Sequence, residues 1–293
     1  RVMNEQMERF FDIEPYHTYR DYFNVSTAIA VSPESGIGTE NTIRNTKFET
    51  TFTGEVGLRG NYSTIFNYAM EVSPVDESNL NQSLIIVTPN TIDYGGITEM
   101  WTDGSAIAFC PLSEDSYPYD ARGIIQHEAG GHGFGKLGDE YIYHNTFIDF
   151  CDCTCCEHVF EFNIAKSLGW YENLSLTGKM HEVPWSHLIF DDRYSDVVDI
   201  YEGGFMHARG VFRSEQNSCM NNNISYYNAI SREAIVKRIM EYAGESYSFE
   251  KFVENDKRDA VNSLSRSAER PGVTVRGNQY APRIHKGKPD ILK

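Results

Sequence analysis

Long apolar runs are missing from this sequence, and basic residues are scarce. No stretch approaches the roughly 18 apolar residues of a membrane-spanning helix, so we expect no transmembrane segment. Only 26 basic residues stand against 42 acidic ones, which gives a formal net charge of -16. Because a field of that sign repels phosphate backbones, we expect no nucleic-acid partner. With 40% apolar content, the 293 residues can build one large domain or two subdomains.

The first ten residues also lack the apolar core of a secretory signal. The chain begins with Arg rather than Met, and we interpret it as a mature or trimmed chain from which a signal or lipoprotein anchor has been removed. The acidic charge fits solubility outside a cell. We therefore expect a secreted or cell-surface anchored protein.

Cysteine is uncommon overall but concentrated in one place. Four of the six cysteines lie in the hexapeptide CDCTCC, residues 151–156, and the others are Cys110 and Cys219. An even number in an exported chain favours disulfides, and we predict at least one within this cluster. Free thiols and a second metal site are the alternatives, since thiolates bind zinc well.

Apolar periodicity and turn residues predict a mixture of helices and strands. The expected helices cover 5–11, 62–72, 159–167 and 231–243, and the expected strands cover 25–31, 83–87 and 106–110. A further helix begins after Asp120, a good N-cap. Residues 170–224 contain scattered Pro, Gly and Asn and look irregular. This order predicts an α+β fold in two subdomains.

The helix after Asp120 carries His127, Glu128 and His132. A His-Glu pair followed by a second His is typical of zinc peptidases. Two neutral imidazoles hold zinc and leave room for a water, and the carboxylate beside the first His takes the proton of that water. We therefore predict zinc bound by the two histidines, with Glu128 as the general base.

The two histidines lie five positions apart, whereas the usual motif places them four apart. On a regular α-helix, at about 100° per residue, the two rings would point about 140° apart. We predict that the backbone at Gly130-Gly131 departs from the α-helix, through a π-bulge or a helix end, so that both rings reach one ion. After Gly135 the chain can turn back, which would bring Asp139 or Glu140 to the metal as a third ligand.

The string HEAGGHGFGKLGDEY, residues 127–141, resembles the motif of the bacterial immunoglobulin A peptidase family of zinc metallopeptidases. Flanking pieces at 168–171, 202–205, 210–213 and 218–220 are similar too, so the resemblance covers roughly residues 20–245. The chain looks most like the exported Bacteroides-type members. Family members look metzincin-like, with an Asp third ligand and a Met-turn beneath the metal.

The resemblance implies specific roles for residues of this chain. His127, His132 and Asp139 would bind Zn²⁺, Glu128 would be the general base, and Met220 would be the Met-turn residue. Asp139 follows His132 by seven positions, one later than the usual metzincin position, so Glu140 stays a competitor for the third ligand.

The implied fold is a metzincin-like zinc peptidase of the α+β class. It would have a mixed twisted sheet with backing and active-site helices, and a loop-rich C-terminal subdomain that ends in a helix. We expect an N-terminal subdomain with the sheet and active-site helix at 1–133. A C-terminal subdomain with the third ligand and Met-turn would follow at 134–259, and an extended tail at 260–293.

These features together predict a zinc metallopeptidase, most simply an endopeptidase. Its substrate would be a protein or peptide, and a host glycoprotein is one candidate. The strand at 106–110 is a candidate edge for pairing with an extended substrate. The alternatives are a binding module whose metal site is ruined by the inserted glycine, and a zinc hydrolase acting on another bond. We interpret the other histidines as surface or core residues: His144, His158, His181, His187 and His207.

Overall fold

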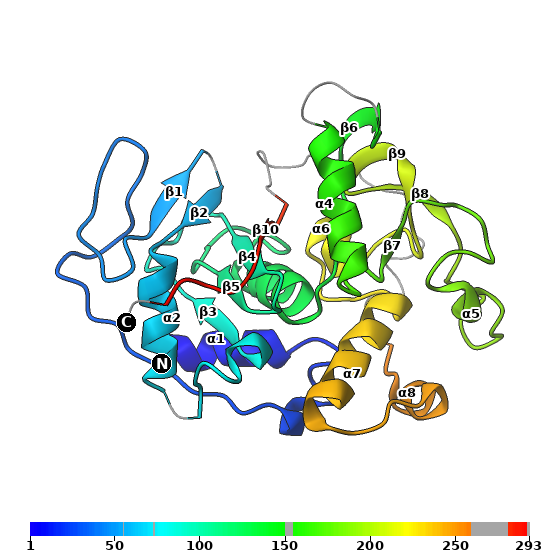
Figure 1. Cartoon of the computed structure of the whole chain (residues 1–293), viewed down its shortest axis with the longest axis horizontal. Helices are drawn as coiled ribbons and strands as arrows, with labels where there is room; N and C mark the ends of the chain where they lie inside the picture. The colour runs from blue at the N-terminus through cyan, green and yellow to red at the C-terminus, as the bar shows by residue number, and fades with distance from the viewer. Residues whose placement is uncertain (55, 73, 150–154, 259–280, 292–293) are drawn as a thin grey trace. The chain divides into compact units, whose positions relative to one another are not determined.

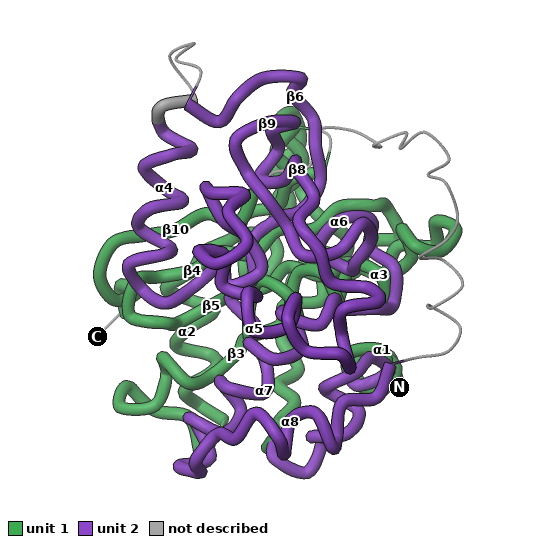
Figure 2. The backbone as a smooth tube through the Cα atoms, turned by 90° about the vertical axis from the view of Figure 1, so that its right-hand side faces the viewer, with its two compact units in different colours: residues 1–10, 23–134, 275–293 green, residues 11–22, 135–274 purple. Residues whose placement is uncertain are grey.

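Helices and mixed sheets form an α+β fold in the computed structural model, which describes residues 1–54, 56–72, 74–149, 155–258 and 281–291 (Figure 1). The chain forms two compact units (Figure 2). Unit 1 comprises Arg1–Phe10, Phe23–Phe134 and Val275–Lys293, and unit 2 comprises Phe11–Tyr22 and Gly135–Thr274. Within the described residues, every helix is too short or too polar to cross a membrane.

Unit 1 is built from short strands and helices that surround one sheet. Its elements are α1 (Val2–Phe11), β1 (Thr51–Thr53), β2 (Gly57–Arg59), α2 (Tyr62–Met70), η2 (Leu80–Gln82), β3 (Leu84–Val87), β4 (Ile97–Trp101), β5 (Ala106–Phe109), α3 (Ala121–Ile125), the π-helix η3 (Gln126–Phe134) and β10 (Arg283–His285). The predicted helix at 62–72 is confirmed. It begins where the Asn61 side chain accepts a hydrogen bond from the Thr64 N–H, which caps the first turn.

The main sheet of unit 1 has the strand order β10-β4-β5-β3 and mixed directions. Strand β5 runs antiparallel to β4 and parallel to β3. Our expectation that residues 106–110 form an edge is therefore wrong, because β5 is paired on both sides. All four β5 residues are buried, as expected for an Ala-Ile-Ala-Phe strand with no polar side chain to face water.

Strand β10 comes from the segment that we expected to be an extended tail, and it pairs in parallel with β4. Side chains of β10 bind Glu99 of β4, whose side chain is completely buried. The Glu99 carboxylate accepts hydrogen bonds from the Tyr62 hydroxyl at 2.8 Å, from Arg283 at 3.2 Å and from His285 at 2.7 Å. The Arg283 guanidinium and the His285 ring on β10 thus compensate a carboxylate that would be costly to bury alone.

The apolar core of unit 1 lies between the sheet and the helices beside it. Its buried members are Phe52, Leu58, Ile65, Phe66, Leu80, Val87, Ile97, Trp101, Ile107 and Phe109. The predicted strand at 25–31 does not join this core. That segment has no regular structure, and Ile29 and Val31 are 80% and 79% exposed. The prediction was wrong because a β-type composition forms a strand only where a partner strand and a buried face are available.

Unit 2 contains a small sheet and most of the long helices. Its elements are η1 (Arg20–Tyr22), β6 (Ile142–Phe147), α4 (Cys155–Ser167), β7 (Leu174–Ser175), α5 (Ser186–Ile189), β8 (Tyr201–Gly204), β9 (Met206–Arg213), α6 (Cys219–Asn222), α7 (Ala229–Ala243) and α8 (Phe249–Asn255). The predicted helices α4 and α7 are confirmed. Both are followed by a glycine with positive φ, Gly169 at 72° and Gly244 at 69°.

The segment 170–224 is more regular than we expected. Strand β9 pairs in parallel with β6 and antiparallel with β7 and β8. The strands escaped detection because Gly203, Gly204 and Gly210 interrupt the apolar alternation, and all three adopt positive φ.

Candidate metal centre

The motif helix changes its winding at the position where the motif begins. Helix α3 runs from Ala121 to Ile125 and is capped by Asp120, whose carboxylate accepts the Gly123 N–H. From Gln126 to Phe134 the chain forms the π-helix η3, with hydrogen bonds from residue i to i+5. The prediction of a non-α backbone at Gly130-Gly131 is confirmed, and the distortion extends over nine residues rather than a single bulge.

The π-helix brings the two motif histidines together. The Nε2 atoms of His127 and His132 lie 3.1 Å apart, and the ring centroids are 4.8 Å apart in an edge-on arrangement. Both side chains are nearly inaccessible, with exposures of 4% and 1%. The predicted convergence of the two rings is therefore confirmed, because an i+5 turn returns the second histidine to the side of the first.

Two glycines allow other parts of unit 1 to approach this helix closely. A Cβ on Gly133 would lie 2.5 Å from Cδ1 of Leu84 in β3. A Cβ on Gly96, just before β4, would lie 3.0 Å from Cγ of Glu128. A side chain at either position would press on the helix that carries the histidines. Glycine at these two positions therefore allows the sheet and the helix to pack closely.

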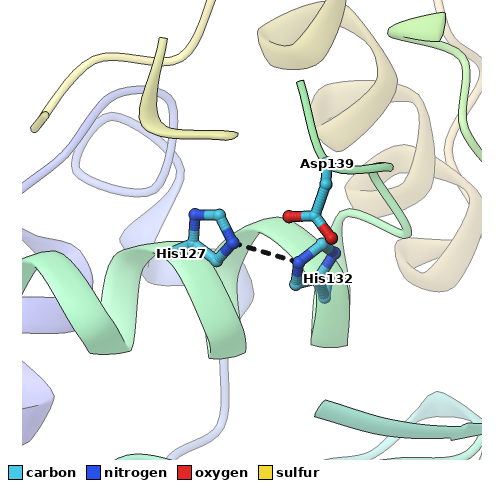
Figure 3. A group of neighbouring side chains, drawn as sticks. All are labelled: His127, His132 and Asp139. Atoms are coloured by element: carbon cyan, nitrogen blue, oxygen red, sulfur yellow. Dashed lines mark hydrogen bonds between the residues drawn. The ribbon is translucent and has the colours of Figure 1, made fainter. Parts of the chain in front are cut away.

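Asp139 completes a group of potential metal ligands. His127, His132 and Asp139 each offer one ligand atom, and these atoms all lie within 4.8 Å of one another (Figure 3). Asp139 is completely buried, and the turn that precedes it includes Lys136 at a positive φ of 52°. Two imidazoles and a carboxylate are the nitrogen and oxygen donors that zinc accepts in catalytic sites, so the residues present fit zinc.

Glu128 is oriented by a residue that the sequence analysis missed. The Thr98 hydroxyl on β4 lies 2.9 Å from Oε2 of Glu128 and 2.8 Å from the Glu128 carbonyl oxygen, and it can donate to either. Thr98 itself is buried, while Glu128 keeps partial exposure. A threonine thirty positions before Glu128 carries no sequence signal, because only the packing of β4 against η3 brings it here.

Glu140 lies next to Asp139 but belongs to a different hydrogen-bond network in unit 2. Its buried carboxylate accepts hydrogen bonds from Asn173 at 2.9 Å, from Asn228 at 2.7 Å and from the Ser218 hydroxyl at 2.5 Å. Burial raises the pKa of Glu140, although these hydrogen bonds work in the opposite direction. Three donors from distant segments thus hold this carboxylate, and it is not in the ligand group formed by Asp139.

Met220 is tied to the same segment through the backbone. It is completely buried in the short helix α6, and its carbonyl oxygen accepts the Glu140 N–H at 2.8 Å. The Ser218-Cys219-Met220 turn is therefore fastened to Glu140 by both a side chain and a backbone hydrogen bond.

The cysteines divide into two groups. Cys110 and Cys219 are buried thiols. Burial, together with the nearby charge of Glu128, raises the pKa of Cys110, which makes its thiol unreactive. The predicted disulfide in the Cys151–Cys156 cluster falls outside the described residues, apart from the backbone of the first turn of α4, and it stays a prediction.

An α+β fold in which two histidines of a distorted motif helix and a later aspartate form a buried group defines a protein with a candidate metal centre. The family model for IgA Peptidase M64 matches residues 3–166, more than half of the chain. The chain belongs to this peptidase family, and the resemblance in its motif is confirmed. The matched range includes the motif and Asp139 and ends before Met220. No curated protein matches the chain.

Proposed function

We propose that this peptidase is a zinc-dependent endopeptidase of metzincin-like architecture. The observation that carries the proposal is the 3.1 Å approach of the His127 and His132 Nε2 atoms, with an Asp139 oxygen close enough to share one ion. Two imidazoles facing each other in a buried site beside a carboxylate make a ready cation site. Membership in a peptidase family supports peptide hydrolysis and a protein or peptide substrate.

We propose His127, His132 and Asp139 as the zinc ligands. Asp139 is favoured over Glu140 because the Glu140 carboxylate already accepts three hydrogen bonds. Met220 is proposed as the Met-turn residue, supported by its burial and by its backbone hydrogen bond to Glu140, the neighbour of Asp139. Zinc, when bound, supplies a Lewis acid that lowers the pKa of water and polarises a carbonyl.

Glu128 is proposed as the general base. It follows the first ligand directly, and its carboxylate is partly exposed, so water can reach it. The Thr98 hydroxyl lies 2.9 Å from one oxygen of this carboxylate and orients the group to accept a proton from the attacking water. The same carboxyl group then delivers that proton to the leaving amine.

The test separates the base from the metal ligands. Glu128→Gln should retain zinc, measured by elemental analysis, and should lose about 100- to 10,000-fold in kcat. Glu114→Gln, an exposed glutamate of unit 1, is the matched control and should retain both zinc and activity. The substrates are peptides blocked at both ends, because only an endopeptidase cleaves them. Full activity of Glu128→Gln, or no cleavage by the zinc-loaded parent across a peptide library, would overturn the proposal.

We further propose that the protein acts outside the cell, secreted or anchored at its surface. Three observations support this proposal: the clustered cysteines, the acidic charge and the resemblance to exported members of the family. Host glycoproteins are then accessible substrates. Fractionation of cells that produce the natural protein should find it in the medium or on the surface, and recovery only from the cell interior would refute this.

A further inference from the structure

Two histidines that we had interpreted as ordinary surface or core residues meet in unit 2. Nδ1 of His158 on α4 lies 2.9 Å from Nε2 of His207 on β9. Their ring centroids are 5.2 Å apart at an angle of 69°. Both elements lie in the upper part of unit 2, beside β6 (Figure 1). This pair resembles His127 and His132, where two ring nitrogens also face each other at hydrogen-bond distance.

A third histidine stands beside this pair on the neighbouring strand. His144 on β6 is the register partner of His207 in the parallel β6–β9 pairing. Its ring centroid lies 5.8 Å from that of His207. Because His144 is exposed, its side chain can change rotamer and turn its ring toward the pair at small cost. Three imidazoles from three different elements therefore lie close together, and all three can share one ion once His144 changes rotamer.

Burial and a neighbouring hydroxyl both act on the ring of His207. His207 is completely buried, and burial, with the charges that His158 and His144 would carry, lowers its pKa to about 4. Burial and His144 lower the pKa of His158 in the same way. The Thr146 hydroxyl lies 3.1 Å from Nδ1 of His207, so it can orient the ring and direct Nε2 toward His158.

The His158–His207 pair needs only a small adjustment to share an ion. With zinc–nitrogen distances of about 2.0–2.1 Å and tetrahedral angles, two coordinating nitrogens lie about 3.3 Å apart. The His158–His207 separation of 2.9 Å is shorter by a few tenths of an ångström, a shift that a half-buried side chain on α4 can make. Without an ion, the two rings share a single hydrogen bond.

We propose that His144, His158 and His207 form a second transition-metal site, which stabilises unit 2 and is not catalytic. The ion would join α4 to the paired strands β6 and β9, with water or another side chain in the remaining position. Imidazole ligands suit zinc, and also copper and nickel. Cys151, Cys153, Cys155 and Cys156 lie in the same stretch of sequence between β6 and the first turn of α4, but the site we propose consists of the histidines.

The test counts zinc ions in protein without a polyhistidine tag, after saturation with zinc and removal of loosely bound metal. The parent should hold two ions per chain. His158→Gln and His207→Gln should each hold one, and so should His127→Gln. The double variant His127→Gln/His158→Gln should hold none. His181→Gln is the control, because His181 stacks on Phe190 elsewhere in unit 2, and it should keep both ions.

A second measurement guards against misfolding of the buried His207 variant. In the His127→Gln background zinc should raise the melting temperature, and adding His158→Gln should remove that effect. Two ions in His158→Gln, or a single ion in the parent that disappears in His127→Gln, would overturn the second site and leave the candidate active site intact. If His158→Gln loses an ion while His127→Gln holds as many ions as the parent, the result would instead count against the proposed function.

Discussion

The Nε2 atoms of His127 and His132 lie 3.1 Å apart although five positions separate the two residues. A regular α-helix would point their rings about 140° apart. The π-helix η3 removes this difference, and Gly130 and Gly131 lie at its middle. Unusual backbone of this kind costs on the order of 1–3 kcal/mol, which coordination of a metal can offset. We therefore expect metal binding and the π-helical backbone to stabilise each other.

Replacing Gly130 with Val should weaken zinc binding at the candidate active site. A β-branched side chain restricts the backbone, and Gly130 is buried, so a larger side chain has little room. The i+5 turn should then be disfavoured, and the rings of His127 and His132 should separate. We expect at least a tenfold lower zinc affinity by competition with a chelator, or about 1.4 kcal/mol. Ala243→Val at the exposed end of α7 introduces the same residue type and should not change the affinity. If Gly130→Val binds zinc as tightly as the parent, zinc binding does not depend on the i+5 turn at Gly130.

Asp139→Asn and Glu140→Gln should have different consequences. If Asp139 is the third ligand, Asp139→Asn should lower zinc affinity by more than about 100-fold while the protein stays folded. Glu140→Gln should keep zinc but lose stability, by about 1–3 kcal/mol, because an amide NH₂ cannot accept hydrogen bonds from the donors around it. Chelator competition and urea denaturation measure the two effects. The reverse pattern would make Glu140 the ligand.

Thr98→Val should lower kcat and leave zinc bound. The change removes the hydroxyl that lies 2.9 Å from the Glu128 carboxylate, which weakens the hold on the orientation of that carboxylate. A hydrogen bond to a charged group contributes about 1.5–3 kcal/mol, which corresponds to a loss of roughly 10- to 100-fold. KM should change little. Thr91→Val, which removes a similar hydroxyl–carboxylate contact with Asp93, is the control and should leave both constants unchanged.

The double variant Arg283→Ala/His285→Ala should destabilise unit 1. It removes the two β10 partners of Glu99 and leaves the buried carboxylate with the Tyr62 hydroxyl. We expect a loss of about 2–4 kcal/mol in the free energy of unfolding. Adding Glu99→Gln should recover part of the loss, because it removes the buried charge. Lys288→Ala, an exposed neighbour, should be neutral. If adding Glu99→Gln lowers the stability of the double variant further, the buried charge of Glu99 is not the cause of the lost stability.

Unit 2 should lose stability in acid through Glu233. This buried carboxylate lies 2.7 Å from His187, 2.9 Å from Lys237 and 2.8 Å from the Tyr247 hydroxyl. Burial alone would raise the pKa of Glu233, but its contacts with His187 and Lys237 outweigh burial and hold it below the ordinary value of 4.5. A lowered pKa in the folded state stabilises the protein above pH 4.5, and that contribution disappears as the pH falls through the folded-state value.

Glu233→Gln should therefore be less stable than the parent at pH 7, and the difference should shrink below pH 4.5. Urea denaturation between pH 3 and pH 7 measures it. Glu241→Gln, an exposed glutamate of α7, should follow the parent at every pH. A difference between Glu233→Gln and the parent that stays constant with pH would exclude the ionised carboxylate as its source.

The sequence alone determined the features that depend on neighbours in the chain. Asp120 caps α3 because its side chain reaches an N–H three residues away, and Gly169 and Gly244 end helices because they adopt positive φ. The five-residue spacing of His127 and His132 likewise required a departure from the α-helix, since helix geometry is local.

Only the tertiary structure decided which segments meet. Strand β5 is central because β3 and β4 pair with it on both sides, and the composition of a single strand does not specify its partners. Thr98 contacts Glu128 because β4 packs against η3, and His144 faces His207 because β6 pairs with the distant strand β9. Glu140 differs from Asp139 by one position, yet Asn173, Ser218 and Asn228 give it a different environment. Long-range contacts of this kind follow from packing the whole chain, which no local pattern encodes.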